Sequence, residues 1–362
     1  MSVKIGVSPI SWTNDDMPDL GRDTTVEHCL QEGSQAGYRG FELGGKWPRE
    51  VSVLEPLFNK YDMDVVSSWF CGGLLKDSIE GEIKRITPHM QLLKDLGTDV
   101  IVYCEMDSCV HGDITSPLSK RPMLDDDQWE EWAEKLNELA KYTLSHGMKL
   151  AYHHHMGTVV QIEEEIDKLM SMTTSDLGLV FDTGHLIYAG ADPLRVYKKH
   201  SDRVMHIHCK DVRDEILNDS LEADSSFLNA VLNGVYTVPG DGVFDFPGLF
   251  KMVSENDFKG WIVVEAEQDP AKAHPLTYVT MGYKNIESYC EKFGIEMGAA
   301  ALQFSLRDLR ISSTLCGVSS PESIQKNLAW AQTSIPSEFW DEVLALPFST
   351  DDPEANRVYT PG

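Results

Sequence analysis

The chain has 362 residues, a hydrophobic share of 42% and a formal net charge of −27 at pH 7. This length accommodates one large domain or two ordinary ones, and a surface this acidic repels phosphate backbones, which argues against a nucleic-acid-binding protein. No segment approaches the roughly 18 apolar residues that span a membrane, and the first residues show no secretion signal.

Short apolar runs alternate with longer amphipathic segments along most of the chain. Eight runs are expected to form strands, at residues 3–7, 38–43, 64–69, 99–103, 149–154, 177–182, 203–209 and 261–265. Amphipathic spacing predicts helices between them, for example one that begins near Thr24 and one over residues 126–145. This alternation predicts an α/β protein whose parallel strands close into a (β/α)8 TIM barrel of about 250 residues. A doubly wound open sheet is the alternative, but no glycine-rich phosphate turn follows the first run.

Two connections are long, at residues 104–125 and 210–246, and both are rich in turn-forming residues. We expect them to lack regular structure and to lie at the catalytic end, where the loops that follow barrel strands gather. After about residue 293 the pattern changes to short helical segments and a polar tail. The sequence therefore predicts a barrel over residues 1–293 and a helical or irregular C-terminal extension over residues 294–362.

Four successive strands in the second half of the chain end in residue types that bind metals. From the fifth strand to the eighth, these residues are His153, Asp182, His208 and Glu265. Because such ends converge around one mouth in a closed barrel, we expect a divalent-metal site there. Imidazole combined with carboxylate suits Mn²⁺, Co²⁺, Fe²⁺ or Zn²⁺. Side chains alternate along a strand, so His155, His206 and Glu267 should share a face with a ligand, whereas His154 points away and is interpreted as structural.

Earlier strand ends carry candidate substrate-binding residues that would line the same mouth. These are Trp12, Asn14, Glu42, Lys46 and Glu105. The alternative for each is a turn or a buried packing residue. Asp15 and Asp16 are interpreted as solvated or as a helix start, and His111 as a packing residue that could instead belong to the site.

Several longer motifs give the chain a family resemblance. They are PISWTNDD at residues 9–16, ELGGK at 42–46, PLSKRP at 117–122, AYHHHMGT at 151–158, DTGHL at 182–186, TVPGDG at 237–242 and VEAEQDP at 264–270. In these motifs the chain resembles the xylose-isomerase-like TIM barrels, and among them the inosose dehydratases, over roughly residues 1–290. Many sugar isomerases share the DTGH pattern, whereas the triple histidine followed by Met-Gly-Thr is more specific.

The resemblance implies a metal set of Glu, Asp, His and Glu on the last four strands. Asp182, His208 and Glu265 match the last three positions, and this chain offers His153 where most relatives have Glu. Two carboxylates and two neutral imidazoles would leave a divalent site formally neutral, which makes the ion a stronger Lewis acid than three carboxylates would.

The implied reaction is the loss of water from scyllo-inosose, giving a trihydroxycyclohexane-1,2-dione in inositol catabolism. The implied enzyme is a hydro-lyase that uses Mn²⁺ or Co²⁺, with glutathione as a candidate thiol activator. We expect His155 to be one acid–base group and Lys210 or Glu267 the other, while His185, Asp211 and His206 orient the ligands.

A small-molecule substrate is expected, with no nucleic-acid or membrane partner and with a homo-oligomer as a candidate assembly. The seven cysteines are dispersed, which predicts packed thiols in the reducing cytoplasm.

The end of the chain resembles a different family. The segments QFSLRD at residues 303–308 and GVSSPE at 317–322 resemble the C-terminal end of aldo-keto reductases. The reductase barrel and its catalytic motifs are not recognisable elsewhere in the chain. The resemblance therefore implies a fused remnant or docking appendage rather than a nicotinamide-binding enzyme.

Three alternatives stay open. A metal-dependent ketose epimerase or isomerase needs the same enediolate, so only its product separates it from a dehydratase. An abasic-site endonuclease on the same barrel would need a basic DNA-binding face, which the charge of −27 opposes. A non-catalytic sugar-binding protein would bind metal and inosose without turnover.

Overall fold

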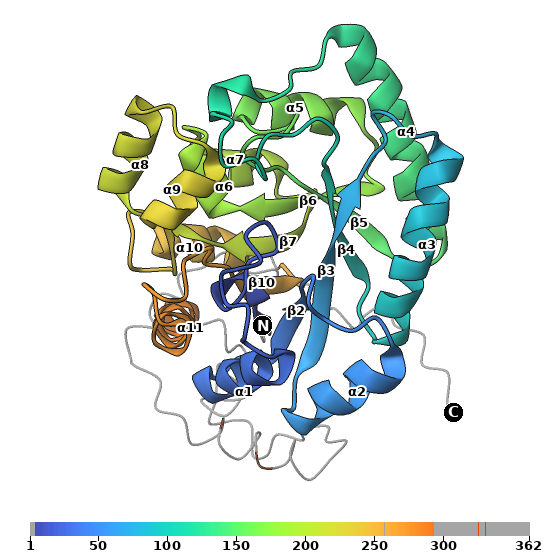
Figure 1. Ribbon diagram of the computed structural model, residues 1–362. Helices are drawn as coiled ribbons and strands as arrows, with labels where there is room; N and C mark the ends of the chain where they lie inside the picture. The colour runs from blue at the N-terminus through green and yellow to red at the C-terminus, as the bar shows by residue number, and fades with distance from the viewer. Residues whose placement is uncertain (1–3, 257, 293–324, 326–329, 331–362) are drawn as a thin grey trace, which may run out of the picture. The chain divides into compact units, whose positions relative to one another are not determined.

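A computed structural model describes residues 4–256 and 258–292, together with Gln325 and Trp330. Eight parallel strands form a closed barrel in the order β1-β10-β7-β6-β5-β4-β3-β2 (Figure 1). Their bounds are Lys4–Val7 (β1), Gly40–Leu43 (β2), Asp64–Gly72 (β3), Val100–Glu105 (β4), Lys149–His153 (β5), Leu177–Asp182 (β6), Val204–Cys209 (β7) and Trp261–Val264 (β10). Each predicted run forms one of these strands, so the predicted TIM barrel is confirmed.

Helices follow the strands and cover the outside of the barrel (Figure 1). They are α1 (Val26–Ala36), α2 (Val51–Lys60), α3 (Ile79–Asp95), α4 (Asp126–Ser145), α5 (Glu163–Met172), α6 (Thr183–Tyr188), α7 (Pro193–His200), α10 (Phe246–Glu255) and α11 (Pro275–Lys292), with short 3-10 turns at Pro9–Ser11 and Leu118–Lys120. The predicted helices are present: Thr25 caps α1, and a capping box between Asp125 and Gln128 starts α4. No described helix combines the length and apolar character that a membrane crossing needs.

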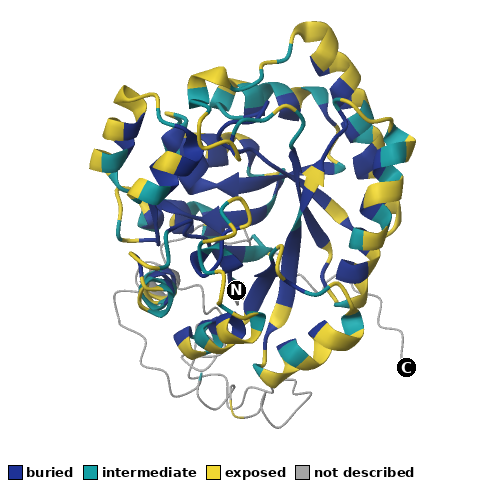
Figure 2. Cartoon of the chain, in the orientation of Figure 1, coloured by how far each residue is buried: buried dark blue, intermediate teal, exposed yellow. Residues whose placement is uncertain are grey.

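The strands are buried because helices or side chains cover both of their faces. Strands β4 and β6 are buried at every residue, which explains their nearly continuous apolar sequences (Figure 2). The register of the parallel strands also brings residues of the site next to one another. Asp182 at the end of β6 pairs with His208 on β7, and Val264 at the end of β10 pairs with Cys209.

The connection over residues 210–246 is more regular than predicted. It contains β8 (Asp211–Val212), α8 (Asp214–Glu222), α9 (Phe227–Asn233) and β9 (Tyr236–Thr237), with β8 and β9 paired as a small antiparallel sheet. The prediction of an irregular connection was wrong here, because short helices of this kind depend on tertiary packing rather than on their own propensity. Phe227, Val231 and Tyr236 are buried in a separate hydrophobic cluster that also contains Met156 and Tyr188.

The predicted extension over residues 294–362, with its resemblance to aldo-keto reductases, lies outside the described residues apart from Gln325 and Trp330.

Candidate metal centre and its cavity

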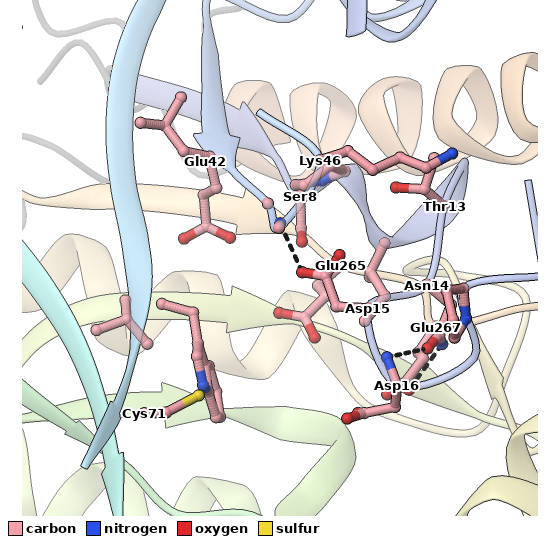
Figure 3. A pocket seen from close by; sticks show the side chains of 18 of the residues that line it. Ser8, Thr13, Asn14, Asp15, Asp16, Glu42, Lys46, Cys71, Glu265 and Glu267 are labelled. Atoms are coloured by element: carbon pink, nitrogen blue, oxygen red, sulfur yellow. Dashed lines mark hydrogen bonds between the residues drawn. The ribbon is translucent and has the colours of Figure 1, made fainter. Parts of the chain in front are cut away.

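A cavity of about 550 Å³ opens at the carboxyl ends of the strands, a size that suits a small molecule (Figure 3). Side chains from both halves of the barrel line it, including Asn14, Glu42, His155, Glu265 and Glu267. The cavity therefore lies where a TIM barrel places its active site.

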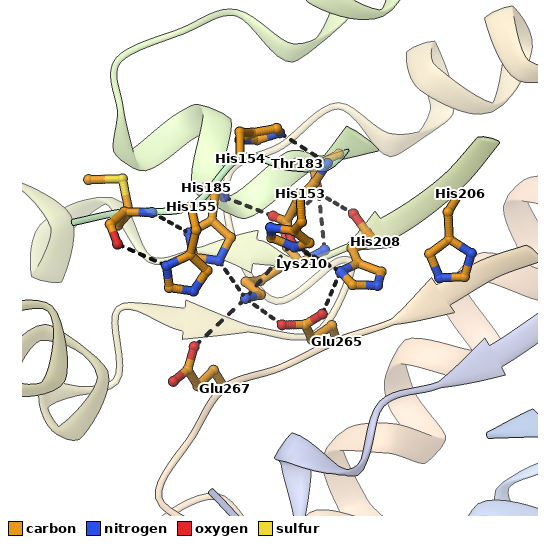
Figure 4. Close-up of polar contacts among 12 residues, drawn as sticks. His153, His154, His155, Thr183, His185, His206, His208, Lys210, Glu265 and Glu267 are labelled. Atoms are coloured by element: carbon orange, nitrogen blue, oxygen red, sulfur yellow. Dashed lines mark hydrogen bonds and ion pairs between the residues drawn. The ribbon is translucent and has the colours of Figure 1, made fainter. Parts of the chain in front are cut away.

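His153, Asp182, His208 and Glu265 come together at the ends of their strands; Figure 4 shows His153, His208 and Glu265 of this group. Each offers one ligand atom, and these four atoms all lie within 4.8 Å of one another. His208 Nδ1 lies 2.6 Å from Glu265 Oε2, 3.2 Å from His153 Nε2 and 3.5 Å from Asp182 Oδ2. The structure thus brings together all four residues of the predicted metal set.

The donor set fits a divalent cation. Asp182 Oδ2 is buried without a hydrogen-bond partner, although it faces two imidazole nitrogens at 3.5 and 3.6 Å. Leaving a buried carboxylate oxygen unpaired is costly, and a cation shared by these atoms would satisfy it. Two carboxylates and two imidazoles suit Mn²⁺, Co²⁺, Fe²⁺ or Zn²⁺ better than Mg²⁺ or Ca²⁺.

Lys210 is a fully buried cation beside the metal set. Its Nζ lies 2.7 Å from Glu265 Oε1 and 3.8 Å from both Asp182 Oδ2 and Glu267 Oε2. Burial lowers the pKa of Lys210, but the surrounding carboxylates outweigh burial and raise it. Burial likewise raises the pKa of Glu265, yet the charges of Lys210 and His208 lower it to about 2. Gly184 makes room for this lysine, because a Cβ there would lie 2.6 Å from Lys210 Cγ.

His155 lies between the metal set and the cavity. Its Nδ1 donates a hydrogen bond of 2.8 Å to the carbonyl of Met156, so in the neutral ring Nε2 carries the lone pair. Burial and the nearby His111 lower the pKa of His155 well below its usual value. The ring packs against Phe227, with centroids 4.8 Å apart. His155 is therefore a neutral imidazole on an apolar wall.

Glu267 faces the cavity from the chain segment after β10 (Figure 3). Its Oε1 accepts a hydrogen bond of 3.2 Å from Asn14 Nδ2. Burial raises the pKa of Glu267 to about 7, although the charge of Lys210 opposes this shift. A carboxyl group with this pKa can both hold and release a proton near neutral pH.

The predicted orienting residues lie in three different environments. His185 accepts from Lys210 Nζ at 3.2 Å and contacts the Tyr236 hydroxyl at 3.1 Å. His206 Nε2 contacts the Glu42 carboxylate at 2.9 Å, and its ring centroid lies 5.1 Å from that of His208. The Asp211 carboxylate accepts from four backbone amides, of Val212, Gly240, Gly242 and Phe244, and so fixes a loop.

Three of the predicted substrate-binding residues use their polar groups in hydrogen bonds to other protein groups. Trp12 is 1% exposed, and its Nε1 donates to Glu32 at 2.6 Å. Lys46 Nζ donates to the backbone carbonyls of Gly21 and Arg22. The Glu105 carboxylate is buried and accepts from the amides of Leu74 and Asp107 and from Trp132 Nε1. Asn14, Glu42 and Lys46 line the cavity, whereas Trp12 and Glu105 do not belong to its lining.

Several residues in or beside the cavity have no role in the predicted site. Asp16, interpreted as solvated, lies 3.3 Å from His111 Nε2, and both residues line the cavity. Phe227 and Tyr236 reach the histidine cluster from the connection between β7 and α10. The PISWTNDD motif directly after the first strand was a usable signal for Asp16, whereas no pattern pointed to the two aromatic residues.

Comparison with known proteins identifies the family. Residues 30–283 match the family described as xylose isomerase-like TIM barrel, and the chain belongs to this family. Within it, the chain is 46% identical to the rhizopine catabolism protein MocC of Rhizobium meliloti, over 83% of this chain and 92% of the relative. It is 45% identical to an inosose dehydratase of Clostridium perfringens (strain ATCC 13124), over 79% of this chain and 97% of the relative.

A solved structure of similar fold is the IOLI protein with a bound zinc atom. It is 14% identical to this chain, with a TM-score of 0.58, and the match covers 80% of this chain and 98% of the other. At this identity the likeness supports the fold alone.

Proposed function

We propose that this protein is a metal-dependent hydro-lyase that removes water from scyllo-inosose to give a trihydroxycyclohexane-1,2-dione in inositol catabolism. The observation that carries the proposal is the identity of 42–45% to several proteins named inosose dehydratase, over at least 96% of their length. The cavity supports it, because His155, a neutral imidazole, and Glu267, a carboxyl group with a raised pKa, both line a space that fits a small cyclic ketone.

His153, Asp182, His208 and Glu265 would hold the divalent metal, for which Mn²⁺ and Co²⁺ are the proposed ions. When bound, such an ion polarises the ketone oxygen and stabilises the negative charge that develops on it. Lys210 keeps Glu265 ionised, which preserves the charge of the ligand set. Glutathione as an activator and a cytoplasmic location belong to the same proposal and rest on the resemblance to the dehydratases.

His155 is the proposed base. The carbon–hydrogen bond beside the ketone breaks, and the proton goes to Nε2, the nitrogen left free by the hydrogen bond to Met156. The rings of Trp69 and Phe227 pack against His155, with centroids 5.8 and 4.8 Å away, and His155 lines the cavity where the substrate would bind.

Glu267 is the proposed acid. It lines the cavity and gives its proton to the departing β-hydroxyl, so the carbon–oxygen bond breaks and water leaves. The resulting enol rearranges to the dione. Lys210 is less suited to this step, because its Nζ is fully buried and bonded to Glu265. It positions Glu265 and Glu267 instead.

The proposal is tested by adding Mn²⁺ or Co²⁺ to the metal-stripped protein with scyllo-inosose and following the ultraviolet absorbance of the dione. We expect dione to form only with metal, and omission of glutathione tests the activator. Intact substrate in the presence of bound metal would reject the dehydratase. An isomeric ketose in the product mixture would instead assign the cavity to an epimerase.

A further inference from the structure

Glu42 on β2 contacts two histidines on β7, which is three strands away around the barrel. Its Oε1 lies 2.9 Å from His206 Nε2 and 3.1 Å from His208 Nε2, and it also accepts from Ser67 Oγ at 2.6 Å. All of these groups are buried. The three donors converge on a single oxygen of Glu42, Oε1.

These contacts decide where the imidazole protons lie. An ionised carboxylate can only accept, so both histidines must carry a hydrogen on Nε2. In neutral His206 the other nitrogen, Nδ1, then has a lone pair, and that atom is buried without a partner. In His208, Nδ1 instead points at Glu265, Asp182 and His153.

We infer that Glu42 is a positioning residue that fixes the tautomer of His208 and thereby makes Nδ1 its metal-binding atom. A carboxylate behind a ligating imidazole orients the ring and increases its basicity. With a metal bound, Glu42 would complete a carboxylate–histidine–metal arrangement that joins β2 to β7, through residues 166 positions apart. The inference rests on the metal site of the proposed function and is independent of the dehydration reaction.

The second imidazole of the metal set lacks this support. His153 Nδ1 is buried, and no described residue accepts a hydrogen bond from it. The two histidines are thus held differently, and a change at Glu42 should act on the metal set through His208 alone.

Glu42, His206 and His208 also lie close enough together to resemble a three-residue metal site. The hydrogen bonds favour the positioning role, because the three donor–acceptor pairs around Oε1 already satisfy the carboxylate oxygen and both Nε2 atoms. A second ion would also require His208 to bridge two metals. We therefore expect one ion per chain.

The experiment is Mn²⁺ binding to the metal-stripped full chain, measured without substrate by competition with a chelator. Removal of such a partner costs about 10- to 100-fold in metal affinity, so we expect about 100-fold for Glu42→Ala and about 10-fold for Glu42→Gln, which keeps an acceptor oxygen. The matched control is Glu82→Gln, since Glu82 is also a buried carboxylate and it contacts Gly73, Tyr103 and Arg85 instead of a histidine. Equal affinities for wild type and Glu42→Ala, or two ions per chain, would overturn the inference.

A spectroscopic measurement on the wild-type chain covers the case in which the variants do not fold. Zn²⁺ is diamagnetic, so the imidazole nitrogens of the zinc-loaded protein can be assigned by ¹H–¹⁵N correlation. We expect His208 to carry its proton on Nε2. The ¹⁵N signal of its Nδ1 should shift away from its metal-free position when zinc binds. Metal on Nε2, with the proton on Nδ1, contradicts the role of Glu42 whatever the protein catalyses.

Discussion

The two halves of the barrel contribute to the site in different ways. The strands from β5 onward place metal-capable and acid–base residues at their ends, within short local motifs. The strands from β1 to β4 and their loops supply the groups that hold those residues, such as Glu42 against His208 and Asn14 against Glu267. The metal-capable and acid–base residues thus stand in short motifs of the second half. Their orientation depends on contacts with the first half, between residues 166 and 253 positions apart.

The largest loss of turnover should come from removing a proposed metal-binding residue of the second half. Asp182→Ala takes away the unpartnered carboxylate oxygen at the centre of the metal set. Because metal stabilisation of a developing oxyanion is worth several kcal/mol, we expect turnover to fall by about 10⁴-fold. Metal content and dione formation are measured together. Asp192→Ala, at the N-cap of α7, is the control that should keep both.

A smaller loss is expected from His155→Ala, which removes the proposed base and keeps all four ligands. General-base catalysis typically contributes 10²- to 10⁴-fold, and we expect about 10²- to 10³-fold in kcat with the metal still bound. Metal analysis alongside single-turnover kinetics separates the two roles. A variant that loses its metal and retains turnover would show that His155 is a ligand and that another group is the base.

The same contrast explains what could be predicted from the sequence. Periodicity located all eight barrel strands, and the four metal-capable residues stand at strand ends that any closed barrel must bring together. The contacts of Glu42 with β7 could not be predicted, since strand alternation fixes the face of a side chain but not the partner that it reaches across the mouth. Nor could the helices α8 and α9, whose stability comes from burying Phe227 and Val231 in their own cluster.

A substitution of Trp12 tests whether this residue of the first half stabilises the fold or contacts the substrate. Trp12→Phe removes the Nε1 donor to Glu32 and leaves a small cavity beside Phe41, whose ring centroid lies 5.4 Å away. We expect the free energy of unfolding to fall by about 2 kcal/mol, as for the loss of a hydrogen bond to a charged group. Urea denaturation measures this change. KM should stay within about twofold of wild type, given that each factor of ten in affinity requires 1.4 kcal/mol; a much larger rise in KM would assign Trp12 to the substrate wall.

The smallest effect concerns the ion pair of Asp16 and His111 at the rim of the first half. Burial lowers the pKa of His111, but hydrogen bonds to Asp16 and Cys109 outweigh it and raise the pKa to about 10. A histidine whose pKa is higher in the folded chain stabilises it fully below the unfolded value of about 6.5, and this stabilisation is lost as the pH rises through about 10. Since the Asp16 side chain is 32% exposed, we expect Asp16→Asn to cost only about 1 kcal/mol at pH 6.

Urea unfolding of wild type and Asp16→Asn at pH 6 and above pH 10 checks this prediction. The two proteins should differ at the lower pH and converge at the higher one, because neutral His111 no longer favours a carboxylate over an amide. A difference that is the same at both values would mean that Asp16 acts through the backbone turn at Asn14, whose Oδ1 accepts from the amides of Asp16 and Met17, rather than through charge. The two outcomes separate an electrostatic role of Asp16, through a protonated His111, from a role in the shape of the turn; the His111 ring centroid lies 5.2 Å from that of His155, so the first case would also place a positive charge beside the proposed base.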